Sequence, residues 1–134
     1  MKKFSELNIP DNLQYSKDHE WVLKEGENLK VGISDYAQDQ LGDIVFVELP
    51  EVGAILAKAE VFGTVESVKS VSELFMPVAG TVISVNASLG ENPELVNTSP
   101  YTDGWMLFLK PDNPDDTGAL MDAGQYREFI AGSR

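Results

Sequence analysis

The stretch 61–77 alternates apolar and polar residues in two short runs that meet at Val68 and Lys69. Alternation with a period of two is typical of half-buried strands, and two such runs joined by a short turn indicate a β-hairpin. The turn is unusual, because a two-residue turn normally needs glycine or asparagine to reach positive φ, and Val68-Lys69 offers neither. The predicted register places Val61, Gly63 and Val65 on one face, with Leu74 and Met76 opposite Gly63 and Val61.

Other β-rich runs lie on both sides of this hairpin, at 19–23, 29–33, 42–47, 80–85 and 105–109. The first two are separated by the polar segment 24–28, which suits a hairpin loop. Segments 42–47 and 80–85 share a glycine, two β-branched positions and a final valine, so they predict two similar half-sheets that bury their apolar faces together. The run 105–109 is apolar throughout, which predicts a strand buried on both faces.

A short helix is expected at 35–41. Ser34 is a favourable residue before the start of a helix and Gly42 a favourable residue after its end. Because isolated helices shorter than about 12 residues are marginal in water, this one must be held by packing on a sheet. Residues 1–13 show no comparable pattern and are expected to be a loose lead-in.

The C-terminal part predicts a helical tail over about 114–131. Pro111 and Pro114 end the sheet before it, because proline cannot donate to a ladder. Asp122 and Gln125 have the spacing of a capping box, and the tail is expected to cover the open side of the sandwich. A chain of 134 residues without a change of composition is one domain by size, which we take to span 1–134.

Composition narrows the chemistry that the chain can perform. It contains no cysteine, so disulfides, thiolate metal sites and a thiol redox centre are excluded, and any redox chemistry must come from a cofactor. The net charge of −12 opposes binding to nucleic acid and to anionic membranes, and favours a soluble monomer that meets basic partner proteins. No signal peptide and no run of about 18 apolar residues are found, so we expect a soluble, cytoplasmic protein.

Lys69 is the strongest candidate for a functional residue. A place where local sequence preference is overridden is often functional, and Lys69 stands at such a turn. The alternative is an ordinary solvated lysine, which is the commoner situation. His19 is the single histidine, and one histidine cannot supply a metal site of familiar ligand count, so a hydrogen-bonded structural role is expected for it.

The segments around Lys69 resemble the lipoyl-lysine hairpin of the glycine cleavage system H-protein family. The resemblance rests first on Glu66-Ser67-Val68-Lys69-Ser70 and on Met76-Pro77-Val78-Ala79-Gly80-Thr81-Val82. It extends, in order, through His19-Glu20-Trp21, Gly32 to Gln38, Leu41 to Pro50, Asn97-Thr98-Ser99-Pro100-Tyr101 and Gly104-Trp105. Ser70 differs from the alanine often found after the lysine. The implied fold is mainly β, a two-sheet barrel-sandwich of the lipoyl- and biotinyl-carrier type.

The resemblance implies a carrier and not an enzyme. Lipoate would be attached covalently to Lys69 as N6-lipoyllysine by a lipoate ligase or a lipoyl or octanoyl transferase. The arm would take an aminomethyl group from the PLP-dependent glycine decarboxylase, the P protein, and pass it to the tetrahydrofolate-dependent aminomethyltransferase, the T protein. Electrons would go to dihydrolipoamide dehydrogenase, the L protein. Eukaryotic relatives would work in the mitochondrial matrix.

The loaded arm would carry a cationic amine, so acidic residues near the hairpin are candidates for holding it. Matching family positions suggest Glu20 first, and then Glu73 and Asp18 as cleft contacts. Two other functions stay open at this point. The chain could relay lipoate to other lipoyl domains, or it could be an unmodified adaptor that binds proteins through its acidic surface.

Overall fold

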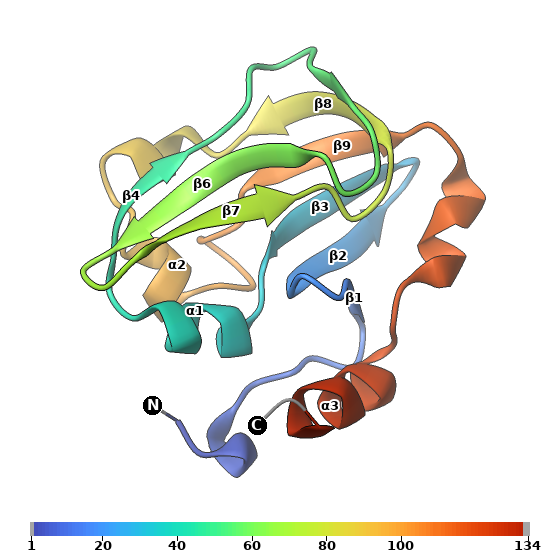
Figure 1. The fold of residues 1–134 in the computed structure, drawn as a ribbon. Coiled ribbons are helices and arrows are strands. Elements are labelled where there is room, and N and C mark those ends of the chain that lie inside the picture. Colours follow the sequence, from blue (N-terminus) through green and yellow to red (C-terminus); the bar gives the residue numbers. More distant parts are fainter. Residues whose placement is uncertain (1, 133–134) are drawn as a thin grey trace.

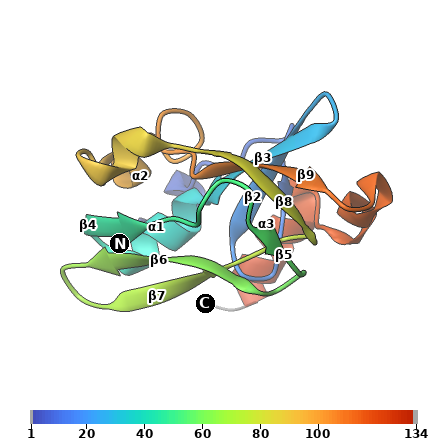
Figure 2. The same ribbon diagram turned by 90° about the horizontal axis from the view of Figure 1, so that it is seen from above.

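Two antiparallel sheets make up most of the molecule, and the computed structural model describes residues 2–132 (Figure 1). The larger sheet has the strand order β1-β2-β3-β9-β8-β5, and the smaller has the order β4-β6-β7. The strands are β1 Gln14–Tyr15, β2 Glu20–Glu25, β3 Asn28–Ile33, β4 Ile44–Glu48, β5 Ile55–Leu56, β6 Val61–Ser67, β7 Val71–Phe75, β8 Gly80–Val85 and β9 Leu107–Pro111. Figure 2 shows β6 and β7 in one layer with β8 and β9 in the other. The mainly β, barrel-sandwich prediction is confirmed.

The helical segments are short and lie between or after the strands. They are the 3₁₀ segments η1 Phe4–Glu6, η2 Ala87–Gly90 and η3 Pro114–Ala119, and the α-helices α1 Asp35–Leu41, α2 Leu95–Thr98 and α3 Ala123–Gly132. In α1 the predicted cap is present, because Ser34 Oγ accepts a hydrogen bond from Ala37 N. Gly42 ends the helix with φ +82°, a conformation that favours glycine.

The main core fills the space between the two sheets. Its members are apolar residues of both sheets, among them Val31, Val65, Val82 and Leu107, each fully buried. This is the burial that the hydrophobic effect requires of two sheets that each have one apolar face. The segments 42–47 and 80–85 therefore do face each other across a core, but they belong to sheets of three and six strands.

A second apolar cluster lies where α3 packs beside β1. Tyr15 and Tyr126 stack there with ring centroids 4.4 Å apart, and Trp21, Ile9 and Leu13 are buried with them. The described part of the predicted lead-in 1–13, residues 2–13, is thus not loose, because its apolar side chains complete this cluster. The helical tail is interrupted between η3 and α3, and α3 covers the β1 end of the larger sheet (Figure 1). The capping box forms: Asp122 N donates to Gln125 Oε1 and Gln125 N donates to Asp122 Oδ1.

The β6–β7 hairpin departs from the predicted register at one end. Gly63 pairs with Leu74 as expected, but Val61 pairs with Phe75 because a bulge lies between Val61 and Gly63. Phe62 is therefore turned into the core, 3% exposed, whereas Val61 is 38% exposed. The prediction that Val61 shares the buried face with Val65 is wrong.

Two other boundaries differ from the sequence-based expectation. The β2–β3 turn is tighter than the predicted loop 24–28, because the strands continue to Glu25 and from Asn28 and leave only Gly26-Glu27 between them. The last strand begins at Leu107 and not at residue 105. It is not buried on both faces, because Phe108 is partly exposed and packs edge-on against Trp105.

Candidate functional site

The β6–β7 turn is built by a serine and not by a glycine. Ser67 N donates to Ser70 O at 2.8 Å, which closes the turn around Val68 and Lys69. Ser67 Oγ then accepts hydrogen bonds from Lys69 N and Ser70 N, both at 3.1 Å. Neither Val68 nor Lys69 has a positive φ. A side-chain oxygen that satisfies the turn amides explains how the sequence avoids the usual glycine.

The turn is also attached to the loop 42–44, which runs from the end of α1 into the first residue of β4. Val68 N donates to Asp43 O at 3.0 Å. The side chain of Lys69 passes over Gly42, so that a Cβ at position 42 would lie 2.9 Å from Lys69 Cε. Lys69 is exposed, and Val68 beside it is 69% exposed. The fold therefore fixes the backbone of the lysine while its amine stays accessible to a large partner.

A cleft of about 250 Å³ lies beside the hairpin, between α1 and β7. Leu41, next to Gly42, is at one part of its wall, and Ser72 and Glu73 of β7 are at another. Asp18 and His19 also line it. Glu73 is four residues from Lys69, about 13 Å along an extended strand. That span suits a lysine side chain extended by an acyl chain of octanoyl length.

Two of the three predicted arm contacts line this cleft, and the third, Glu20, is not part of its lining. Asp18 and Glu73 line the cleft. Glu20 is only 1% exposed; its Oε1 accepts from Ser16 Oγ at 2.6 Å and its Oε2 from Phe75 N at 3.4 Å. Burial raises the pKa of Glu20 to about 8, although these hydrogen bonds act in the opposite direction. The carboxyl is thus mostly neutral at pH 7, and it joins β2 to β7 across the two sheets.

His19 has the structural role that was expected. Its Nδ1 is hydrogen-bonded to Tyr126 OH at 2.8 Å, and the same hydroxyl is 2.7 Å from Ser34 Oγ at the start of α1. Burial lowers the pKa of His19. This residue therefore links α3 to the wall of the cleft. Its backbone has φ +71°, one of two positive values at non-glycine positions among residues 2–132.

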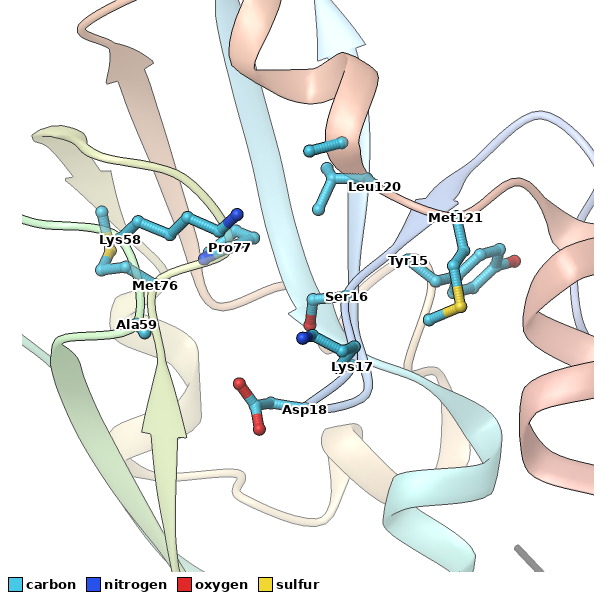
Figure 3. A pocket seen from close by; sticks show the side chains of 11 residues that line it. Tyr15, Ser16, Lys17, Asp18, Lys58, Ala59, Met76, Pro77, Leu120 and Met121 are labelled. Carbon is cyan, nitrogen blue, oxygen red and sulfur yellow. The ribbon is translucent and has the colours of Figure 1, made fainter. Parts of the chain in front are cut away.

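A larger cavity of about 350 Å³ lies on the other side of Asp18 (Figure 3). Figure 3 shows Lys17, Asp18 and Lys58 around it, together with Tyr15 and Met121. Its lining includes neither α1 nor the hairpin turn, so of these two cavities the smaller cleft is the one next to the hairpin.

Within residues 2–132, no three His, Asp or Glu side chains gather in a way that could hold a metal ion. In the same range no helix has the length and apolar character needed to cross a membrane.

The sequence analysis predicted Lys69 but did not predict the residues that hold its turn. Ser67 could have been found, because a serine just before a turn often accepts hydrogen bonds from the turn amides. The contributions of Gly42 and Asp43 are long-range contacts, and nothing in the local pattern indicates them.

The chain is similar to known proteins over most of its length. Residues 13–133 match the family model described as glycine cleavage H-protein. The chain is 55% identical over 124 residues to the glycine cleavage system H protein of Geobacillus kaustophilus, covering 92% of this chain and 98% of that protein. It is 51% identical to the protein of the same name from Anaeromyxobacter sp. strain K, with 92% and 97% covered. A crystal structure of a glycine cleavage system H protein from Mycobacterium marinum superimposes with a TM-score of 0.84 at 36% identity, covering 92% of this chain and 99% of that chain.

Proposed function

The chain belongs to the glycine cleavage H-protein family, and we propose that its lipoyl group is carried as an amide on Nζ of Lys69. As a member of this family it is a non-catalytic lipoyl carrier of the glycine cleavage system, and it works with the P, T and L proteins of that system. The observation that carries the proposal is the exposed lysine on a turn whose backbone is fixed by Ser67 and Asp43.

The fixed turn supports selection of Lys69 over the other lysines. All lysine amines have the same chemistry, so a modifying enzyme has to distinguish them by the backbone that presents them. A turn that is already ordered costs less conformational entropy when an enzyme binds it. We propose a lipoate ligase, or a lipoyl or octanoyl transferase, as the enzyme that reads this turn.

The chain's own residues would place and shelter the arm. When bound, lipoate supplies a disulfide that accepts electrons and a one-carbon group bearing an amine. Asp18 and Glu73 line the cleft and could attract such a cationic amine. Glu20 is a third proposed contact, but reaching its carboxyl requires its hydrogen bonds to Ser16 and Phe75 to open.

The identities of the three partner enzymes are part of the same proposal. We propose that the three enzymes the carrier meets are glycine decarboxylase, aminomethyltransferase and dihydrolipoamide dehydrogenase. An acidic carrier with a net charge of −12 is suited to partners with basic surfaces around their active sites. The single-domain organisation over 1–134, of which residues 1, 133 and 134 lie outside the described part, and the cytoplasmic location remain predictions.

Intact-mass measurement tests the assignment of Lys69. The protein is incubated with lipoate ligase, ATP and lipoate, and the wild type should gain one lipoyl mass, whereas Lys69→Ala should gain none. Lys24→Ala is the matched control, because Lys24 lies near the turn of the β2–β3 hairpin, and it should be modified like the wild type. A wild type that keeps a free amine at Lys69, with a ligase that modifies another lipoyl domain in the same buffer, would disprove the proposal.

A further inference from the structure

Asn97 of α2 holds the loop 42–44 with every hydrogen-bonding group of its side chain. Its Nδ2 donates to Gly42 O and to Gln38 Oε1, both at 2.9 Å, and its Oδ1 accepts from Ile44 N at 2.8 Å. The residue is thus bonded to the loop on both sides of Asp43. Gln38, the other partner, is itself buried in α1 at 6% exposure and donates to Asp35 Oδ1 at 2.7 Å.

The loop that Asn97 holds is the loop that supports the lysine. Asp43 O accepts from Val68 N, and Gly42 lies under Lys69 Cε. The loop does not fix itself, because Gly42 has φ +82° and ψ −162°, a region open to glycine. An external tether is therefore needed to keep Asp43 O facing the hairpin.

We propose that Asn97 is a positioning residue for Lys69: it acts through Gly42, Asp43 and Ile44 to hold the β6–β7 turn in the form that the modifying enzyme binds. This inference rests on the proposed function of Lys69. It connects Lys69 to a residue 28 positions later in the chain that does not touch the lysine in the described contacts.

The chain contains a matched control in Asn86. Asn86 Nδ2 also donates two hydrogen bonds, here both to backbone carbonyls, those of Asp103 and Trp105, and its Oδ1 also accepts from a backbone amide, that of Ser88. The two asparagines therefore make hydrogen bonds of the same number and direction, so their removal should cost similar stability. Asn86 is not bonded to the hairpin or to the loop 42–44, and only Asn97 should affect the turn.

Two measurements on the full chain test the proposal. Amide hydrogen exchange of Val68 is followed by NMR, and ligase kinetics are measured with the unmodified protein as the variable substrate. In Asn97→Ala, exchange at Val68 should be about fivefold faster, the effect of losing the net stabilisation of one hydrogen bond. KM for the ligase should rise by a similar factor with little change in kcat, because the enzyme must now order the turn on binding.

Asn86→Ala should change neither quantity. Asn97→Asp keeps the acceptor for Ile44 N and the volume of the side chain but loses both donors, so it should behave like Asn97→Ala and serves if the alanine variant does not fold. Equal changes in the Asn86 and Asn97 variants, or an unchanged KM in Asn97→Ala, would overturn the proposal. A wild type that is not lipoylated would refute the role of Lys69, and exchange at Val68 would still decide whether Asn97 holds the turn.

Discussion

The two long hairpins of the molecule make their turns in opposite ways. The β2–β3 turn contains Gly26 with φ +65°, and a Cβ there would meet nothing within 4 Å. Its geometry is therefore specified by its own residues. The β6–β7 turn contains Val68 and Lys69, and its geometry comes from Ser67 Oγ and from Asp43 O. A turn that is specified from outside leaves its own positions free for another use, which here is to present a lysine.

The hairpins also differ in where they need glycine. In β6–β7 the glycine is in a strand, at Gly63, and a Cβ there would collide with the carbonyl oxygen of Glu48 on β4. The missing side chain allows β4 and β6 to approach closely beside the bulge that turns Phe62 into the core. In the β2–β3 hairpin Gly26 allows a positive φ, and in the β6–β7 hairpin Gly63 allows two strands to pack closely.

The largest loss of stability expected from a single substitution follows from that contrast. Gly63→Ala should lower the free energy of unfolding by about 3 kcal/mol, because a backbone carbonyl cannot move aside as a flexible side chain can. Gly26→Ala should cost only about 1 kcal/mol, the strain of a left-handed backbone at an alanine. Urea unfolding of both variants measures the difference. If the two substitutions cost the same, the close approach at Gly63 does not constrain the sheet.

A second prediction concerns the pH dependence of stability, and it rests on the hydrogen bond between Glu20 and Phe75 that joins the two hairpins. Glu20 on β2 accepts from Phe75 N on β7, and burial raises its pKa to about 8 from the ordinary 4.5. The folded state thus prefers the neutral carboxyl, so this group's contribution to stability is fully present below about pH 4.5 and is lost as the pH rises towards 8. The slope of the unfolding free energy can approach about 1.4 kcal/mol per pH unit.

Glu20→Gln tests this contribution. The variant keeps the size of the side chain and cannot titrate, so the wild type minus variant difference in unfolding free energy should fall steadily from pH 5 to pH 8. The subtraction removes the other titrating groups, including Asp35, for which burial acts to raise the pKa but hydrogen bonds from Lys2, Asn8 and Gln38 lower it overall. A difference that does not vary with pH would mean that Glu20 is ionised in the folded protein.

The comparison of hairpins also shows what the sequence could and could not reveal. The helix at 35–41 was predictable to the residue because Ser34 and Gly42 mark its ends locally. The bulge at Phe62 was not predictable. A pattern of alternating apolar and polar residues assumes a repeat of two residues, and it gives no sign of an extra residue in one strand. Lys69 was predicted as the functional residue from an anomaly in its turn and from the family resemblance. Asp43 and Asn97, which correct the anomaly, act over long sequence separations that a local pattern cannot show.

Ser67→Ala is expected to have the smallest effect on the free energy of unfolding. Its effect on the order of the β6–β7 turn should be larger. The loss of the hydroxyl removes the acceptor for Lys69 N and Ser70 N, which are exposed and can bond to water instead, so unfolding should become easier by at most about 1 kcal/mol. Hydrogen exchange at these two amides should nevertheless accelerate, and lipoylation by the ligase should slow by a larger factor than the stability change suggests. Ser67→Thr keeps the hydroxyl and should restore both. If the Ser67→Ala and Ser67→Thr proteins are lipoylated at the same rate, Ser67 is not required to hold the turn. Asp43 and the loop 42–44 would then hold it alone.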